Sequence, residues 1–219
     1  MSRLRLLTLR CLYITLAFAI IGVGIDISIK AALGVGSWTV FHLGVANYVG
    51  LTQGQVSQLV GLCIIAASFF LGVKPALGTV MNMVLIGWFF DISVGYALIP
   101  PASSQLQSLL YLAGSTLIFG FGGAMYMSAG LGAGPRDSLM LALTARTGWP
   151  VGKMRTVMEL TVLIFGWLMG GPVGLGTIVL TFSLGPAIEN SFKIFHWLGR
   201  LNSTTRAVIA VPIKSRAAS

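Results

Sequence analysis

The chain has 219 residues, of which 56% are hydrophobic and only 9% are charged. Soluble domains carry about 25% charged residues, so this composition excludes an ordinary soluble protein and predicts an integral membrane protein. The formal net charge is +9, but the basic residues are spread between long apolar runs instead of gathering on one polar face. This pattern excludes nucleic acid as the expected partner and leaves the lipid bilayer.

Six apolar segments are long enough to cross a bilayer, which takes about 20 residues of helix. Two further segments of helical character, Ser37–Val49 and Pro135–Thr147, are too short to cross. In chain order, the expected spans are Cys11–Ile29, Gln55–Val73, Ala76–Ile99, Leu106–Met127, Met154–Gly170 and Val173–Phe195.

The distribution of Lys and Arg predicts the orientation of these spans, because basic residues favour cytoplasmic loops. Six spans place both termini on the same side of the membrane. With the N-terminus in the cytoplasm, only Lys30 of the 14 basic residues falls outside. We therefore expect a multi-pass protein of the bacterial plasma membrane with both termini cytoplasmic.

The chain also repeats itself at an offset of 98 residues. Gly22-Val23-Gly24 returns as Gly120-Phe121-Gly122, and Leu77-Gly78-Thr79 returns as Leu175-Gly176-Thr177. The register needs no gap, which indicates a duplicated unit. Each copy has three spans, an odd number, so the copies are expected to enter the membrane in opposite directions.

These observations predict the fold class and the domains. The fold is an all-α integral membrane protein with six transmembrane helices as two inverted three-helix repeats, each with one short helix that is either re-entrant or interfacial. The first repeat covers residues 1–99 and the second covers 108–198. An external linker at 100–107 joins them, and a basic cytoplasmic tail follows at 199–219.

The two short segments are the expected solute pathway, because each joins a flexible glycine turn to a helix start. Ser37, Thr39, Asp137 or Ser138 can cap the free N–H groups there, and a helix N-terminus attracts anions. Broken backbone at membrane depth is tolerated where it lines a cavity. The alternative is a pair of interfacial helices that only connect spans. The pathway residues are Gly34, Gly36, Ser37, Thr39, Gly132, Gly134, Pro135, Arg136 and Asp137.

Motifs in the second copy carry a resemblance to a known family. Gly-Leu-Gly-x-Gly-Pro-x-Asp runs from Gly130 to Asp137, and Gly-x-Gly-Thr at 174–177 is followed by Gly-Pro-x-Ile at 185–188. The chain resembles the YczE/YyaS/YitT group of bacterial integral membrane proteins. The resemblance implies a plasma-membrane protein of five or six spans and supplies no activity.

Four acidic residues lie within or near the spans, where carboxylates are costly and usually functional. Asp91 and Glu189 are equivalent in the two copies, while Asp26 and Glu159 lie near the ends of their spans. One interpretation is ion coupling at two vestibules. The other is that these carboxylates pair with Arg155, with Lys193 or with water at the interfaces.

The leading functional hypothesis is a transporter or permease for a small polar or anionic solute. A passive channel and a non-transporting membrane partner of an enzyme or sensor system are the alternatives. No nucleophile–base constellation or phosphate loop is present, so we do not expect an enzyme. No cofactor or metal is expected, because His42 and His196 lack ligand spacing. Assembly into a homo-oligomer stays open.

Overall fold

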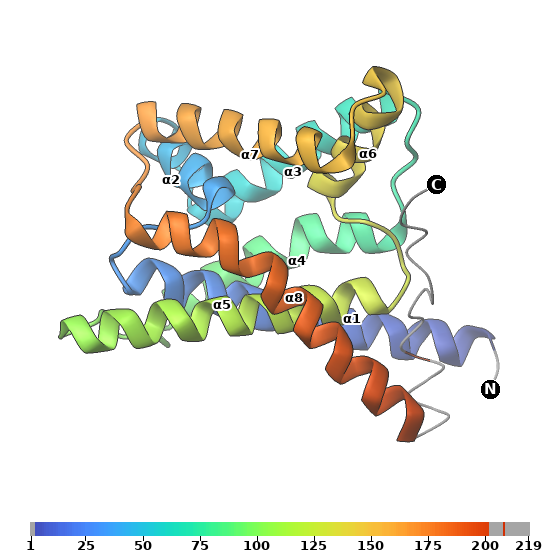
Figure 1. Ribbon diagram of the computed structural model, residues 1–219, viewed down its shortest axis with the longest axis horizontal. Coiled ribbons are helices and arrows are strands. Elements are labelled where there is room, and N and C mark those ends of the chain that lie inside the picture. Colours follow the sequence, from blue (N-terminus) through green and yellow to red (C-terminus); the bar gives the residue numbers. More distant parts are fainter. Residues whose placement is uncertain (1–2, 202–207, 209–219) are drawn as a thin grey trace.

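The computed structural model describes residues 3–201 and 208, which form helices and their connecting loops with no strand among them (Figure 1). Apart from 199–201 and 208, the basic tail expected at 199–219 lies outside the described residues. The helices are α1 Arg3–Lys30, α2 Ser37–Val49, α3 Gln53–Phe70, α4 Leu77–Gly95, α5 Gln105–Ser128, α6 Pro135–Thr147, α7 Val151–Leu168 and α8 Leu175–Leu201.

Each expected segment is a helix. The two short segments have the expected bounds, and the six long ones have shifted ends. α1 begins at Arg3 rather than Cys11, and α4 ends at Gly95 rather than Ile99. Within the described residues, α1, α3, α4 and α5 are long and apolar enough to cross a membrane, judged by length and composition alone. The charged residues of α7 and α8 reduce their apolar character, and the total of six spans stays a prediction.

Local sequence explains where the short helices stop and where α3 starts. α2 and α6 end at Gly50 and Gly148, whose φ angles of 66° and 69° are left-handed and terminate a helix. α3 starts with a capping box, in which the Thr52 hydroxyl accepts from the Gln55 N–H and the Gln55 side chain accepts from the Thr52 N–H.

The two halves of the chain contain the same helices in the same order. The bounds of α2 and α3, shifted by 98 residues, are the bounds of α6 and α7, and the starts of α4 and α8 differ by the same offset. Their glycine turns also match. Gly34 has a φ of 100° and Gly132 has a φ of 117°, a region that other residues rarely adopt.

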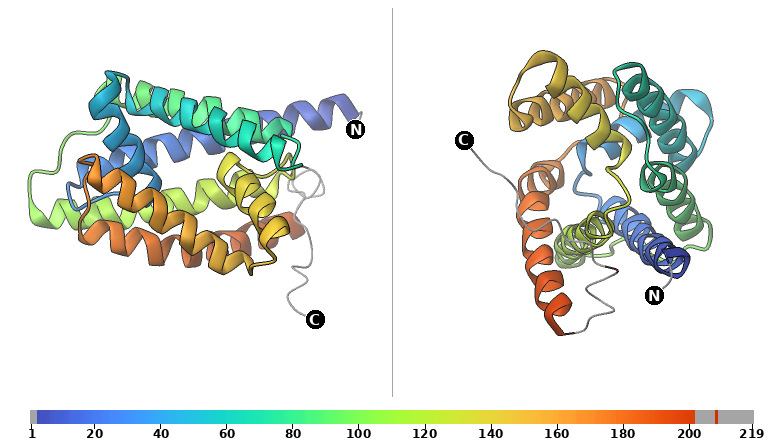
Figure 2. Two further views of the ribbon diagram at one scale, coloured as in Figure 1. Left: turned by 90° about the horizontal axis from the view of Figure 1, so that it is seen from above. Right: turned by 90° about the vertical axis from the view of Figure 1, so that its right-hand side faces the viewer.

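Helices of the two halves pack across each other. α1 and α5 lie side by side, α4 packs on α1, and α8 packs on α5. α2 packs on α7 and α6 packs on α3, and in Figure 1 α2 lies on the left and α6 on the right. In the right-hand view of Figure 2, α3 and α4 occupy one flank and α8 the other. The core lies around Phe18, Ile21 and Met125.

The outer faces of the helices are apolar. Phe70, Leu117 and Leu175 are 81%, 66% and 75% exposed. Large apolar side chains in such numbers on a surface mark contact with another apolar phase, here the hydrocarbon of a membrane. Packing inside therefore depends on close van der Waals contact and hydrogen bonds, since lipid is as apolar as the core.

Candidate functional site: the meeting point of α2 and α6

The site forms where the two short helices begin. Gly36 and Gly134 are the residues that precede α2 and α6, both are extended, and neither helix has a side-chain cap hydrogen bond. The expectation that Ser37, Thr39, Asp137 or Ser138 caps these helices is therefore wrong. The cap position falls one residue earlier, on a glycine that has no side chain to offer.

Trp38 connects the two short helices to α7. Its ring centre lies 4.9 Å from the guanidinium carbon of Arg136, which is a cation–π contact between α2 and α6. Its indole N–H donates to Glu159 Oε1 on α7 at 3.2 Å. Trp38 is only 6% exposed, so these contacts hold it in one position at the start of α2.

Two cavities adjoin this contact. The larger has a volume of about 400 Å³ and the smaller about 100 Å³. A volume of that larger size is in the range of small-molecule sites. The two share a wall, since six residues line both: Trp38, Phe119, Arg136, Arg155, Glu159 and Leu184.

The carboxylates and the arginines of the site differ in the kind of partner they have. Glu159 accepts from Trp38, and Asp137 Oδ2 accepts from the Tyr126 hydroxyl at 3.0 Å. Within the described part of the chain, neither Arg136 nor Arg155 forms an ion pair within 4.0 Å. Two uncapped helix N-termini add partial positive charge. The larger cavity is lined by Arg136, Arg155 and one carboxylate, Glu159, so its lining has an excess of positive charge that favours an anion.

The expected pathway residues divide into two groups. Gly36, Ser37 and Thr39 line the larger cavity. Gly134, Pro135 and Asp137 line the smaller one, and Arg136 lines both.

Gly34 and Gly132 line neither cavity and instead pack on the other half of the chain. A Cβ on Gly34 would lie 2.5 Å from the Gly174 nitrogen, and one on Gly132 would overlap Ala76. The neighbouring carbonyls of Leu33 and Leu131 accept from the N–H groups of Gly176 and Gly78. These two turns hold the halves together, and the expectation that they line the pathway does not fit their position.

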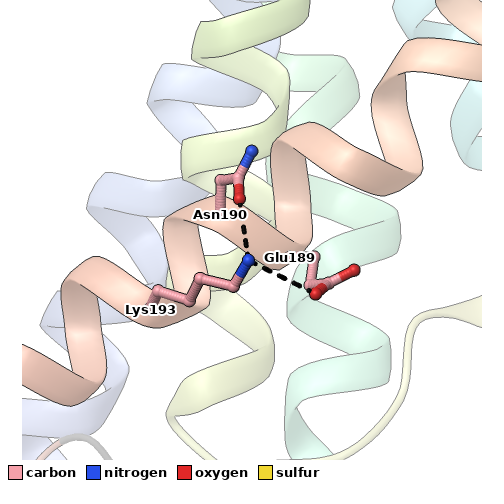
Figure 3. Close-up of polar contacts among 3 residues, drawn as sticks. All are labelled: Glu189, Asn190 and Lys193. Carbon is pink, nitrogen blue, oxygen red and sulfur yellow. Dashed lines mark hydrogen bonds and ion pairs between the residues drawn. The ribbon is translucent and has the colours of Figure 1, made fainter.

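The equivalent acidic residues Asp91 and Glu189 have different surroundings. Asp91 on α4 accepts from the Thr52 hydroxyl at 2.5 Å and from the Gly54 N–H at 3.1 Å, so it holds the start of α3. Glu189 is 73% exposed and pairs with Lys193 at 3.5 Å on its own helix (Figure 3). Neither lines the cavities.

The other two acidic residues also differ. Asp26 is fully buried on α1 and accepts from the Ser93 hydroxyl at 2.6 Å, while its Oδ1 has no partner. Glu159 is the one of the four that lines the cavities. The structure thus brings Glu159 to the expected pathway and leaves Asp26, Asp91 and Glu189 away from it.

Three residues of the site are absent from the pathway expected from sequence. Trp38 reads as an apolar helix residue, and Tyr126 as part of a span. Arg155 carries a signal, because its spacing of four from Glu159 puts both side chains on one helix face. Among the described residues, no three His, Cys, Asp or Glu side chains lie together as a metal site.

Comparisons with known proteins identify the family. The model described as "Family of unknown function (DUF6198)" matches residues 8–193. Over 193 residues the chain is 39% identical to the uncharacterized membrane protein YczE of Bacillus subtilis (strain 168), which covers 84% of this chain and 89% of that protein. No solved structure matches.

Two further proteins are similar to this chain over most of its length. An uncharacterized protein of Haemophilus influenzae is 31% identical over 173 residues, covering 79% of this chain and 78% of that protein. The uncharacterized protein YyaS of Bacillus subtilis is 24% identical over 190 residues, covering 84% and 92%. The resemblance to the YczE and YyaS group is confirmed, and the chain is a membrane protein that belongs to the DUF6198 family.

Proposed function

We propose that this protein is a transporter for a small organic anion, with its site at the contact of α2 and α6. The observation that carries the proposal is the pair of arginines, Arg136 and Arg155, beside the cavity of about 400 Å³ and the two uncapped helix starts. Half-helices whose N-termini point at a central site are how many transporters bind anionic groups.

The proposal includes two inverted repeats with six spans. Its support is the common 98-residue offset of the helix bounds and the odd number of long helices in each half. Trp38 and Arg136 are equivalent positions under this offset, and they touch each other. Equivalent residues meet only close to the axis that relates two copies, so the site lies at the centre of the duplication.

The charges of α7 fit a span in this arrangement. Arg155 and Glu159 both line the larger cavity. Ionisable residues in a transmembrane helix are tolerated where they face a cavity, and there they mark a solute or ion pathway. Glu159, held by Trp38, is the residue of the four acidic candidates that can couple an ion to the solute.

The lining of the larger cavity supports an organic anion over an inorganic one. Its polar part contains Arg136, Arg155, Glu159 and several hydroxyl side chains such as Ser37. Leu160 and Leu163 belong to its apolar wall. A guanidinium binds a carboxylate through two parallel N–H groups, so a small carboxylate with an apolar body fits both parts.

Flux into proteoliposomes tests the transport function. The probes are isotope-labelled acetate, lactate, succinate, benzoate and phosphate, each with and without a pH gradient. Arg136→Gln should reduce uptake of the transported anion about 10- to 100-fold, since a hydrogen bond to a charged group contributes about 1.5–3 kcal/mol. Arg146→Gln is the matched control, because Arg146 is exposed in the last turn of the same helix.

The outcomes separate the functional classes. Steady flux that no gradient accelerates and that does not saturate would favour a passive channel. Absence of flux for every probe would favour a membrane partner protein without transport. An equal loss of uptake in Arg136→Gln and Arg146→Gln would show that Arg136 does not bind the anion.

Thiol labelling tests the proposed orientation. Ser103 lies in the linker between α4 and α5, and Lys74 lies in the loop between α3 and α4, and both are exposed. With the native cysteines replaced by serine, an impermeant maleimide should label Ser103→Cys in whole cells and Lys74→Cys only after permeabilisation. The reverse pattern would invert the topology.

A further inference from the structure

The two halves differ most in the contact between the third and fourth helices of each half. α3 packs along α4, whereas the equivalent helices α7 and α8 make almost no contact within the described residues. Figure 1 shows α8 sloping away from α7 after the loop that joins them. We call the α3–α4 contact the closed seam and the α7–α8 gap the open seam.

The closed seam depends on specific close contacts. Gly54 and Gly87 touch backbone to backbone, since a Cβ on Gly87 would lie 2.5 Å from the Gly54 carbonyl oxygen. Asp91 fastens the end of this seam through Thr52 and the Gly54 N–H. Gln58 adds a hydrogen bond from its side chain to a carbonyl of α4.

The open seam retains the small residues that such a contact needs. Gly152 and Gly185 are the equivalents of Gly54 and Gly87, and a Cβ on either would have no atom within 4 Å. The protein therefore has glycines at two positions of the open seam where nothing presses on them.

The remaining contact residues of the closed seam have their equivalents in the wall of the larger cavity. Gln58 on α3 and Val84 on α4 are joined by a hydrogen bond. Their equivalents are Thr156 on α7 and Phe182 on α8, and both line the larger cavity. Gly61 and Met83, which touch in the closed seam, likewise correspond to Glu159 and Thr181 of the cavity wall. The larger cavity is the space that a closed seam would fill.

We propose that the two seams alternate, so that the open seam closes in a second state while the closed seam opens. The second and third helices of the two halves share their bounds at the offset of 98 residues, and the seam glycines occupy equivalent positions, so each half can adopt the arrangement that the other now has. Exchange of conformation between inverted repeats around a fixed site produces alternating access. In the orientation proposed above, the present state is open toward the cytoplasm and closed by Asp91 toward the outside.

This inference rests on the proposed transport function for its purpose, but its test needs no solute. A Cβ on Gly61 would lie 3.4 Å from the Met83 Cβ, close to the separation found in disulfides. The pair Gly61→Cys and Met83→Cys should therefore cross-link the closed seam when membranes are treated with copper phenanthroline. The equivalent pair, Glu159→Cys and Thr181→Cys, should cross-link only in the second state.

Both pairs are made with Cys11 and Cys63 replaced by serine. The matched control is Thr161→Cys with Thr181→Cys, because a shift of two residues turns the side chain to another face of the α7 helix. We expect each seam pair to form its disulfide above the level of this control. In the variant with all four seam cysteines, oxidation of the closed-seam pair should reduce cross-linking of the other pair to the control level.

Two outcomes would overturn the inference. If the closed-seam pair oxidises fully and the open-seam pair never exceeds the control, the gap is permanent. If both disulfides form in one molecule, the seams do not alternate. Thr156→Cys with Gly185→Cys crosses the same gap and decides the question if Glu159→Cys impairs folding, because in the closed seam a Cβ on the equivalent Gly87 would lie 3.2 Å from the Gln58 Cγ.

The flux assay and the cross-linking assay test the transport function and the alternation of the seams independently. Cross-linking that alternates without flux would retain the motion and remove the anion probes as solutes. Flux without alternation would retain the transport function and describe a fixed pathway, as in a channel.

Discussion

Removal of the Asp91 carboxylate should destabilise the contact between α3 and α4. Asp91→Ala removes the acceptor for the Thr52 hydroxyl, at 2.5 Å, and for the Gly54 N–H, at 3.1 Å. A hydrogen bond to a charged group contributes about 1.5–3 kcal/mol, and partial exposure of Asp91 reduces this, so we expect a loss of about 2–4 kcal/mol. Thr52 keeps its bond from the Gln55 N–H, so α3 keeps its start.

The equivalent residue supplies the control. Glu189 and Lys193 are 73% and 68% exposed, so Glu189→Ala should cost at most about 0.5 kcal/mol. For a chain of this size, about 1 kcal/mol shifts the unfolding midpoint by roughly 2–4 °C. Asp91→Ala should therefore lower the midpoint by roughly 5–15 °C, and Glu189→Ala should leave it within about 2 °C.

The measurement is thermal unfolding in dodecyl maltoside, followed by the fraction of protein that stays monodisperse on size exclusion. The reasoning would be refuted if the unfolding midpoint fell equally in both variants, or fell less in Asp91→Ala than in the control Glu189→Ala. Such a result would mean that the carboxylate does not hold the closed seam, and the asymmetry between the halves would lose its main polar contact.

Two other stability predictions follow. Gly34→Val should abolish folded protein on size exclusion, because a left-handed φ of 100° and the Gly174 backbone leave no room for a side chain. The control Gly36→Val should retain folded protein, because a Cβ at Gly36 would meet nothing within 4 Å. Ser93→Ala should cost about 1–3 kcal/mol in the same thermal assay, since it leaves buried Asp26 without its hydroxyl donor. Restoration of stability in the double variant with Asp26→Leu would support this cause, and an unchanged midpoint in Ser93→Ala would contradict it.

The positions of the helices follow from the sequence because they depend on local signals. Apolar runs give the long helices, and left-handed glycines such as Gly50 and Gly148 end the short ones. The offset of 98 residues predicts that both halves have the same helices, and the bounds of α2 and α3 agree with those of α6 and α7. Such features need no knowledge of which helices meet.

The site required the tertiary structure. Trp38 and Arg136 lie 98 residues apart, and nothing local to either indicates that the indole lies on the guanidinium. Asp91 and Glu189 are the same position in the two copies, yet one holds a neighbouring helix and the other faces outward. The difference arises because α3 packs on α4, whereas α7 does not pack on α8 in the part of the chain that the structure describes. The sequence of neither copy indicates this difference in packing.

The sequence by itself therefore determined the membrane class, the helices and the duplication, because hydropathy, turn residues and repeats act within one segment. Only the tertiary structure decided which glycines turn toward the other half, which carboxylate reaches the cavity, and which seam is closed. The reason is physical: two halves with similar sequences can pack in two arrangements, and the choice between them depends on contacts between segments distant in the chain.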